Sequence, residues 1–246
     1  MVRTLLLPAL LALLCLSGCR KEQWDDCFTG TGAIVLDERA IVGFTSIDLA
    51  DRFDLELIPD SVDRVIVETG DRLLEQVRTE VVGTTLVIRD NNTCNWVRRF
   101  DVTMVAHVHC KALRELVCRG SGRVTCSDTL EAQAFNVQFF GANSEVRLSL
   151  RADVCVVGNN LGPSDVDLSG RVRELRLYNG DNGRIDSRAM QADDVLVNNS
   201  AISDLHVRAD VNVGAEITGS GDVYWEGGGQ ELWTNITGTG RLIHVP

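Results

Sequence analysis

Lysine, proline and aromatic residues are scarce in this sequence of 246 residues. Aromatic residues make up 5% of the chain and hydrophobic residues 44%, so aliphatic side chains must fill the core. Four prolines against 22 glycines indicate turns built on glycine and asparagine. Because 35 acidic residues outnumber 24 lysines and arginines, the net charge of −11 argues against binding to nucleic acid or to anionic lipid surfaces.

Several catalytic and metal-binding motifs are absent as well. The sequence contains no CxxC pair, which argues against a zinc site or a thioredoxin-like redox site. It also lacks GxSxG, HExxH and a phosphate-binding loop, which are signatures of common hydrolases, metalloproteases and nucleotide enzymes. No hydrophobic run is long enough to span a membrane. We therefore expect a protein that is not an enzyme and that needs no cofactor.

The amino terminus reads as a leader. Arg3 precedes an apolar run from Leu5 to Leu14, and the following Leu16-Ser17-Gly18-Cys19 resembles the bacterial lipobox, in which the cysteine is acylated. The alternative is an ordinary signal peptide with an incidental cysteine. We predict a signal peptide over residues 1–18, a membrane anchor on Cys19 and a short acidic tether over 19–31. Arg20, in place of an aspartate, resembles the sorting signal for the outer membrane, facing either the periplasm or the cell surface.

A glycine-centred phrase repeats in the second half of the chain. "ITGSGDVYW" begins at Ile217 and returns as "ITGTGRLIH" at Ile236, and seven such units align between residues 113 and 246. The apolar position before the turn is occupied in order by Cys118, Phe139, Val156, Leu177, Val197, Ile217 and Ile236. The apolar position after the turn is occupied in order by Val124, Val146, Val166, Ile185, Leu205, Val223 and Leu242. Each unit therefore reads as strand, tight turn, strand.

These units predict an all-β fold, a single-stranded right-handed parallel β-helix with rungs of about 20 residues and GSG or NG turns. The alternative is an antiparallel sandwich of hairpins. Glycine or asparagine opens each turn, as at Gly120, Asn179 and Asn199, because positive φ costs these residues little. An outward column also supports stacking, since it predicts four ion pairs between neighbouring rungs: Arg123–Glu145, Asp165–Arg184, Arg184–Asp204 and Asp222–Arg241. The like-charged neighbours Asp204 and Asp222 do not fit this pattern.

The first half is less regular but also alternates with period two. We read residues 32–112 as the wider amino-terminal part of one domain that spans 32–246, because no linker divides the two halves. Residues Asp71 to Val81 predict a short helical excursion, with Asp71 as its N-cap and Leu73, Leu74 and Val77 facing inward.

Runs in this half resemble a known family. The run "FTSIDLADRFDLELIPDSVDRVIVETGDRLLEQVRTEVVGTTLVIRDN", the "CNWVRRF" that follows, the GSG-type turns and the "DCFTGTG" at Asp26 resemble the GIN-domain family of envelope proteins. These are described as head domains of autotransporter adhesins. The resemblance covers nearly all of the mature chain. It implies a parallel β-helix similar to pectin lyases without their catalytic residues, and a role in adhesion.

Six cysteines follow Cys19 in the sequence. Cys118 and Cys126 fall on core columns of one rung and are expected to be buried free thiols. Cys27 and Cys94 lie in irregular segments, and we predict a disulfide between them that pins the tether to the body, although spacing alone cannot fix the pairing.

Only weak signals of chemistry remain. His107 and His109 lie on one strand face and could hold a metal, but no third ligand is in sight, so a structural role is favoured and no metal site is predicted. The acidic pairs Asp165/Asp167 and Asp193/Asp194 could serve a glycosidase. The run Asp181-Asn182-Gly183 could bind calcium, although a simple turn explains it as well.

Aromatic residues gather toward the carboxyl-terminal rungs and suggest a binding surface. By strand parity Tyr224 and Trp233 point outward and Trp225 inward, and Tyr178 is a further candidate for stacking on sugar or protein. The alternative is that Trp225 closes the core and the others are incidental. The last repeat strand is followed only by Val245 and Pro246, without a polar capping unit, so we expect self-association through this end.

Together these features predict a lipid-anchored, non-catalytic β-helical scaffold of the cell envelope. It would serve adhesion, or the binding of a protein partner or a surface glycan. A carbohydrate-active β-helix enzyme and a structural subunit inside the periplasm remain as alternatives.

Overall fold

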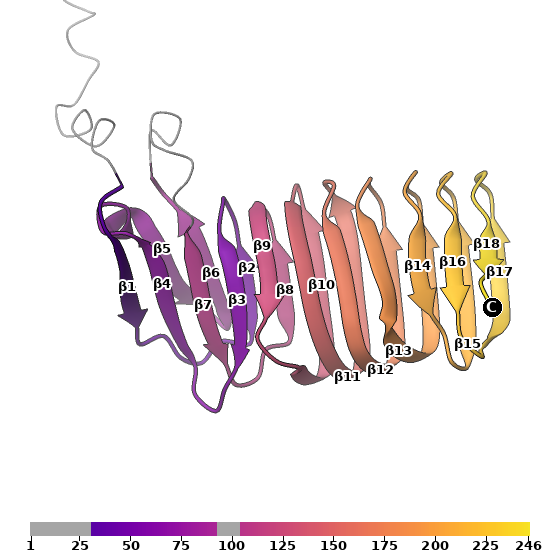
Figure 1. Ribbon diagram of the computed structural model, residues 1–246, viewed down its shortest axis with the longest axis horizontal. Helices are drawn as coiled ribbons and strands as arrows, with labels where there is room; N and C mark the ends of the chain where they lie inside the picture. The colour runs from indigo at the N-terminus through magenta and orange to yellow at the C-terminus, as the bar shows by residue number, and fades with distance from the viewer. Residues whose placement is uncertain (1–30, 93–103) are drawn as a thin grey trace, which may run out of the picture.

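The computed structural model describes residues 31–92 and 104–246. Within these ranges the chain forms eighteen strands and one short 3-10 helix. Figure 1 shows an elongated solenoid with β1 at one end and β18 at the other, in about six turns. The predicted all-β stacked architecture is confirmed, and its right-handedness stays a prediction. The predicted signal peptide, the lipidated Cys19, the tether up to residue 30 and the Cys27–Cys94 disulfide lie outside the described residues.

Eleven strands build the regular part of the stack. They are β8 (Glu115–Cys118), β9 (Ser121–Cys126), β10 (Leu130–Phe140), β11 (Asn143–Leu161), β12 (Asp165–Asn179), β13 (Arg184–Asn199), β14 (Leu205–Arg208), β15 (Asn212–Ile217), β16 (Val223–Glu226), β17 (Gln230–Ile236) and β18 (Leu242–His244). All the pairings between these strands are parallel, which rules out the antiparallel sandwich.

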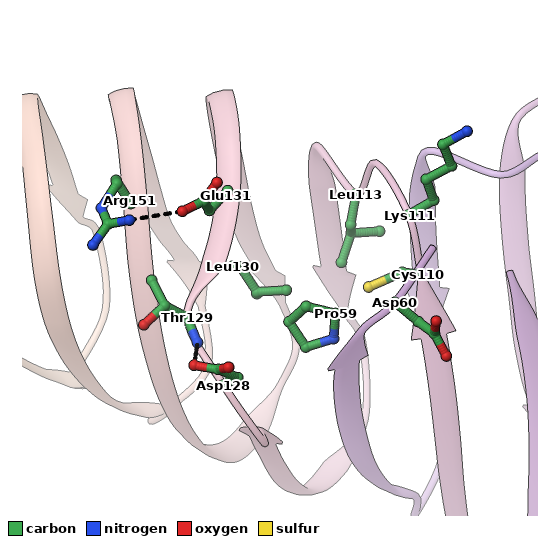
Figure 2. A pocket seen from close by; sticks show the side chains of 10 residues that line it. All are labelled: Pro59, Asp60, Cys110, Lys111, Leu113, Asp128, Thr129, Leu130, Glu131 and Arg151. Atoms are coloured by element: carbon green, nitrogen blue, oxygen red, sulfur yellow. Dashed lines mark hydrogen bonds and ion pairs between the residues drawn. The ribbon is translucent and has the colours of Figure 1, made fainter. Parts of the chain in front are cut away.

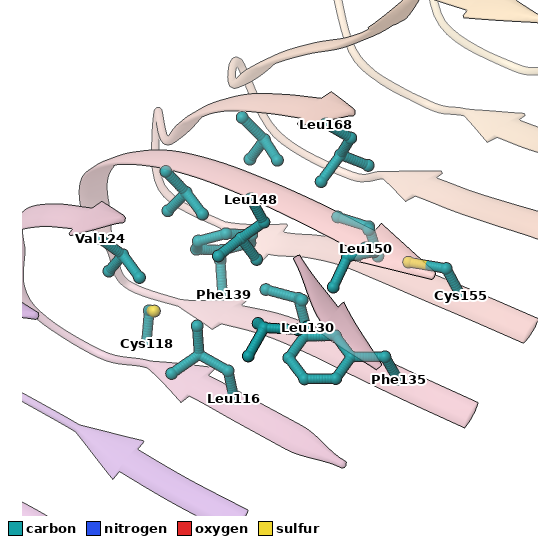
Figure 3. Close-up of a cluster of buried hydrophobic side chains, with 14 of the residues drawn as sticks. Leu116, Cys118, Val124, Leu130, Phe135, Phe139, Leu148, Leu150, Cys155 and Leu168 are labelled. Carbon is teal, nitrogen blue, oxygen red and sulfur yellow. The ribbon is translucent and has the colours of Figure 1, made fainter. Parts of the chain in front are cut away.

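The stack has two faces that enclose the core between them. The first face holds the strands that precede each tight turn: β8, β10, the second halves of β11, β12 and β13, then β15 and β17. The second face holds the strands that follow the turn: β9, the first halves of β11, β12 and β13, then β14, β16 and β18. Figure 3 shows leucine, phenylalanine and cysteine side chains from both faces directed into this interior.

The predicted register of the second face is confirmed along its whole length. The column after the turn pairs rung by rung as expected, from Val124 through Val146, Val166, Ile185, Leu205 and Val223 to Leu242. Its members from Val124 to Val223 are fully buried. Burying one aliphatic side chain of this size contributes about 1.5–3 kcal/mol, so this column is a large part of what holds the rungs together.

The predicted register of the first face is wrong in the middle rungs. Phe139 pairs with Asn159 rather than with Val156, and the column continues through Asn179 and Asn199 to Ile217. Val156 lies half-exposed on the outside, while its neighbour Val157 is buried. At Leu177 and Val197 the predicted column is displaced by two residues from Asn179 and Asn199, and a displacement of two keeps the same hydrophobic pattern. At Val156 the displacement from Asn159 is three residues, because Val154, Val156 and Val157 lie close together and leave the inward side ambiguous.

Buried asparagines, not glycines, therefore line the turn in three successive rungs. Asn159, Asn179 and Asn199 are fully buried, and Asn159 Nδ2 donates to Asn179 Oδ1 at 2.9 Å. Asn179 Nδ2 donates to the carbonyl oxygen of Gly183 at 3.1 Å, and Asn199 Nδ2 donates to that of Gly221 at 3.0 Å. The side-chain amides thus satisfy backbone groups that the turn buries.

The predicted reason for glycine or asparagine at the turn, a positive φ, applies at Gly141 (φ 69°) and at none of the other predicted turn positions. Among the described non-glycine residues only Asp51 has a positive φ. Gly219 and Gly238 also have ordinary φ values, but a Cβ atom at either position would lie 2.0 Å from a carbonyl oxygen of the preceding rung. Close stacking of backbones, rather than a left-handed conformation, therefore requires glycine there.

The amino-terminal strands do not simply add rungs. They are β1 (Ile34–Arg39), β2 (Ser46–Leu49), β3 (Asp54–Pro59), β4 (Arg64–Gly70), β5 (Val77–Val82), β6 (Thr85–Asp90) and β7 (Val105–Cys110). Strands β2 and β3 pair in parallel with β8 and β9 and continue both faces. The pairs β1–β4, β4–β7 and β5–β6 are antiparallel. Parallel stacking thus gives way to a mixed sheet at this end.

The predicted helical excursion shrinks to the 3-10 helix η2 (Leu74–Gln76). Leu73 and Val77 are buried as predicted, and Leu74 is half-buried. Leu73 rather than Asp71 occupies the N-cap, and no side chain caps the helix. Strand β5 begins at Val77, and its β-branched residues favour extended backbone over a longer helix.

The asparagine ladder yields a prediction about stability. Replacing Asn179 by alanine removes the acceptor of Asn159 and leaves the carbonyl of Gly183 without this donor. We expect N179A to lower the free energy of unfolding by about 1–3 kcal/mol, measured by denaturant titration. N182A, at an exposed position of the same turn, is the control and should change it by less than about 0.5 kcal/mol. Equal effects of the two substitutions would contradict the buried role.

Candidate binding faces

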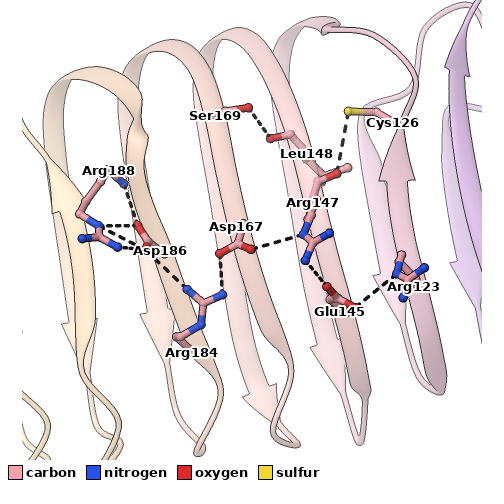
Figure 4. Close-up of polar contacts among 10 residues, drawn as sticks. All are labelled: Arg123, Cys126, Glu145, Arg147, Leu148, Asp167, Ser169, Arg184, Asp186 and Arg188. Carbon is pink, nitrogen blue, oxygen red and sulfur yellow. Dashed lines mark hydrogen bonds and ion pairs between the residues drawn. The ribbon is translucent and has the colours of Figure 1, made fainter.

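The outer surface of the second face is a chain of ion pairs. Figure 4 shows arginines and acids alternating across four strands, from Arg123 on β9 to Arg188 on β13. Arg123 Nε lies 3.3 Å from Glu145, and Arg184 Nη2 lies 2.6 Å from Asp167. Arg147 connects these two pairs by contacting both acids. Exposed pairs of this kind stabilise a fold by only about 0.2–1 kcal/mol each, so their main effect is to fix the register.

Two of the four predicted ion pairs form. Arg123–Glu145 is present, and Arg241 Nη2 lies 2.6 Å from Asp222. Arg184 was expected to pair with Asp165 and Asp204, but it pairs with Asp167 and Asp186. Asp167 lies two residues beyond Asp165 on β12, and Asp186 lies two residues beyond Arg184 on β13 itself, so both are within reach of a long arginine side chain.

The two like-charged aspartates have a separate role that explains their adjacency. Asp204 Oδ1 accepts a hydrogen bond from the backbone N–H of Asp222 at 2.8 Å, and Asp222 Oδ1 accepts one from the N–H of Arg241 at 2.8 Å. Each carboxylate therefore accepts a backbone N–H from the next rung, and Asp222 also pairs with the Arg241 side chain.

The acidic pairs considered for a glycosidase are held by basic and amide groups. Both oxygens of Asp167 contact arginines, Arg147 and Arg184. Asp193 lies 3.4 Å from Arg171. Asp194 Oδ1 accepts from Asn212 at 2.7 Å. This arrangement matches a charge-laddered surface more closely than a catalytic groove.

The turn considered for calcium is explained by its own hydrogen bonds. Asp181 accepts from the backbone N–H groups of Gly162 and Asn182, each at 2.8 Å. These bonds lower the pKa of Asp181. The carboxylate thus joins its turn to the preceding rung.

His107 is clamped between two carboxylates. Its Nδ1 lies 2.7 Å from Glu56 on β3, and its Nε2 lies 3.0 Å from Glu68 on β4. Only the imidazolium can donate from both nitrogens. Partial burial lowers the pKa of His107, but the hydrogen bonds with Glu56 and Glu68 outweigh burial and raise it above 6.5.

His109 has a separate partner and is buried. Its Nδ1 lies 2.8 Å from Asp60, and this bond lowers the pKa of Asp60. Within residues 31–92 and 104–246 no three or more His, Cys, Asp or Glu side chains gather as metal ligands. The hydrogen bonds of the two histidines connect β7 to Glu56, Asp60 and Glu68, which belong to or follow the neighbouring strands β3 and β4.

A polar cleft of about 470 Å³ opens near β7 and β10 (Figure 2). It is lined by Pro59, Asp60, Cys110, Lys111, Leu113, Asp128, Thr129, Leu130, Glu131 and Arg151. Burial, together with Asp63 and Asp60, raises the pKa of Cys110 to about 12. The thiol is therefore protonated at neutral pH and is a poor nucleophile.

The other described cysteines are free thiols in or near the core. Cys118 and Cys155 are buried, and burial raises the pKa of each to about 12, by far the largest effect. Cys126 is half-buried. The expectation of free thiols on core columns is met at Cys118, while Cys126 reaches the edge of the core.

The aromatic residues that gather near the end of the sequence lie on different faces of the structure. Trp225 is 6% exposed and stacks on His244 with ring centroids 4.0 Å apart, so its inward direction is confirmed. Tyr224 lies half-buried on the second face, stacked on His206. Tyr178 and Trp233 lie on the first face and are 40% and 43% exposed. The predicted cluster of three is therefore a pair on one face and a single residue on the other.

Sequence reasoning missed a further aromatic residue on the first face. Phe140 is 41% exposed at the end of β10, and the Arg119 guanidinium lies 5.2 Å from the centre of its ring. Successive residues of a strand point to opposite sides, so the inward position of Phe139 implies that Phe140 points outward.

The fold has known relatives. A family model with the description "Putative auto-transporter adhesin, head GIN domain" matches residues 43–229. The chain belongs to this family. The GIN-domain resemblance seen in the sequence is thus confirmed. Among curated proteins, no sequence matches this chain.

Solved structures are similar to this GIN-domain protein over most of their length. A crystal structure described as a "putative adhesin" from Bacteroides fragilis is 17% identical, covers 87% of this chain and 97% of its own, and has a TM-score of 0.77. A "putative adhesin" from Parabacteroides distasonis is 17% identical over 88% of this chain and 98% of its own, with a TM-score of 0.66. A "putative lipid binding protein" from the same organism is 19% identical over 88% and 98%, with a TM-score of 0.61. At these identities the likeness shows a shared fold. In the described ranges of this chain, no helix has the length and hydrophobicity needed to cross a bilayer.

The clamp on His107 predicts a dependence of stability on pH. A group whose pKa is raised by folding stabilises fully below its unfolded pKa and loses that contribution as the pH rises through its folded pKa. The difference in unfolding free energy between the native protein and H107Q should therefore be largest below pH 6.5 and shrink above it. Denaturant titrations at a series of pH values measure this difference.

The matched control removes the carboxylates instead of the imidazole. In E56Q/E68Q the pKa of His107 is no longer raised. Adding H107Q to that double variant should therefore change the free energy of unfolding little at any pH. A difference between the native protein and H107Q that is constant with pH would contradict the clamp.

Proposed function

We propose that this GIN-domain protein is a lipid-anchored, non-catalytic scaffold of the cell envelope that presents a β-solenoid for adhesion. The observation that carries the proposal is the family match over residues 43–229, in a chain whose leader ends in a lipobox-like Cys19. Its targets would be a protein partner or a surface glycan. The outer membrane is the proposed site, with the solenoid facing the periplasm or the outside.

The geometry suits presentation at a distance from a membrane. Figure 1 places β1, the strand nearest the proposed anchor, and β18 at opposite ends of the long axis. An anchor on Cys19 would hold the β1 end close to the bilayer, because only a short tether separates them. The carboxyl-terminal rungs would then point away from the membrane.

Removal of the acylated side chain tests the anchor. We expect C19S to move from the membrane fraction to the soluble fraction of lysed cells, because acyl chains supply the stable attachment. Native protein that stays soluble would contradict the anchor. An unrelated substitution after the leader, K21Q, is the control and should leave the protein in the membrane fraction.

Protease treatment of intact cells decides which way the solenoid faces. Cleavage on intact cells would support adhesion at the surface. Protection until the cells are lysed would contradict surface adhesion and favour the alternative of a structural subunit inside the periplasm.

We further propose that copies associate through the last rung. Leu232 and Ile236 on β17 are 59% and 43% exposed, although Ile236 continues a column that is buried at Ile217. Strands β17 and β18 also each have a described partner on one side only. An exposed strand edge beside apolar side chains favours pairing with a second copy.

A matched pair of substitutions tests this association. I236K places a charge on the uncovered end and should convert associated protein to monomer, measured by sedimentation of soluble C19S protein. I202K changes an isoleucine that is 70% exposed in a turn away from this end, and it should leave the association unchanged. A C19S parent that is monomeric at high micromolar concentration would overturn the proposal.

A further inference from the structure

We propose that Tyr178 and Trp233 are stacking platforms for one extended, neutral oligosaccharide that lies across the outer surface of the first face. This inference rests on the proposed binding function and names the ligand class and the surface. Tyr224, which the sequence grouped with them, is excluded because it lies on the second face among charged residues.

Both aromatic side chains pack closely against a glycine. A Cβ atom at Gly180 would lie 2.6 Å from Tyr178 Oη, and one at Gly214 would lie 2.5 Å from Trp233 Nε1. The rings therefore rest directly on backbone that has no side chain. Each side chain therefore covers its glycine and still leaves part of its ring in solvent, with exposures of 40% and 43%. An open aromatic ring face held in a fixed orientation suits the apolar C–H surface of a sugar ring.

The surface between the two rings carries oriented polar groups. Asn198, the neighbour of Tyr178 in the next rung, donates through Nδ2 to Glu216 Oε2 at 2.7 Å. Ser200 Oγ donates to Asn198 Oδ1 at 3.2 Å. On the other side of Tyr178, Asn160 Nδ2 donates to Gln138 Oε1 at 2.8 Å. Each amide keeps further donors or acceptors, whose directions these bonds fix, so the surface is prepared for sugar hydroxyls.

The separation of the rings defines the size of the ligand. Tyr178 lies on β12 and Trp233 on β17, with β13 and β15 between them. Three inter-strand steps of about 4.8 Å place the two strands roughly 14 Å apart. A single sugar cannot span that distance, so a ligand that touches both rings must be an extended oligomer.

Charge favours a neutral glycan over the other polymers of an envelope. The net charge of −11 repels acidic polysaccharides and nucleic acids, and the arginine nearest Tyr178 on its strand, Arg176, is paired with Glu174. A protein interface usually has a contiguous apolar centre, whereas amides and a carboxylate separate these two rings. A neutral glycan meets both ring faces and amides without leaving a charge unpaired.

A purely structural role is the competing explanation. Aromatic side chains can cover glycines in sheets and stabilise them without binding anything. The two roles predict different responses, because leucine can cover a glycine but offers no aromatic ring face.

The test uses full-length protein carrying C19S, so that it is soluble, on an array of neutral and acidic oligosaccharides. The C19S parent should bind neutral, linear oligosaccharides longer than a disaccharide. Y178L and W233L should each weaken that binding at least tenfold while the midpoint of unfolding stays near that of the parent. Y178W, which keeps an aromatic platform, should retain binding. Y224L on the opposite face is the matched control and should bind as the parent does.

Several results would overturn the inference. They are binding that Y178L retains, equal loss in Y224L, loss that only tracks unfolding, or a parent that binds only acidic glycans or none. Failure of the inference remains distinguishable from failure of the proposed function. Protein that binds no glycan but is cleaved on intact cells would leave adhesion in place, whereas protection on intact cells would remove surface adhesion as well.

Discussion

The close parallel stacking of each rung on the one before it is the constraint on which the rest of the structure depends. Backbone hydrogen bonds between rungs bring equivalent residues into line, so the column from Val124 to Val223 becomes one continuous buried ridge. The same closeness leaves no room for a Cβ atom at Gly219 or Gly238. It also buries the turns, which is why asparagines are needed there to satisfy the backbone.

Stacking also divides the residues into two classes with different freedom. Inward residues must fit the rungs on both sides, whereas outward residues need only be compatible with a flat sheet. The outward residues of the two faces differ. Alternating arginines and acids cover much of the second face, whereas amides and aromatic rings lie beside a few ion pairs, such as Arg176–Glu174, on the first. A scaffold of this kind can change its binding surface without changing its core, which fits a family described by its adhesins rather than by a reaction.

Much of this fold can be read from the sequence, and the failures are instructive. The second face is correct because its strands follow the turn directly, so Val223 and Leu242 share one distance from their glycines. The first face is displaced by two residues at Asn179 and Asn199 because alternation fixes the side of a strand but not its register. Strand direction leaves no mark on alternation either, which is why the antiparallel pairing of β4 was not foreseen. Parity predicts that Tyr224 and Trp233 point outward, but only the place of each residue before or after the turn separates Tyr178 from Tyr224.

The direction of the backbone hydrogen bonds has a mechanical consequence. They join successive rungs, so they run along the long axis of the solenoid in Figure 1. A pull between the two ends of the solenoid therefore acts on the hydrogen bonds between rungs, and each pair of neighbouring rungs transmits it to the next. The interfaces between rungs are thus coupled in series, so the rung interface with the fewest hydrogen bonds limits how much tension the whole solenoid can bear.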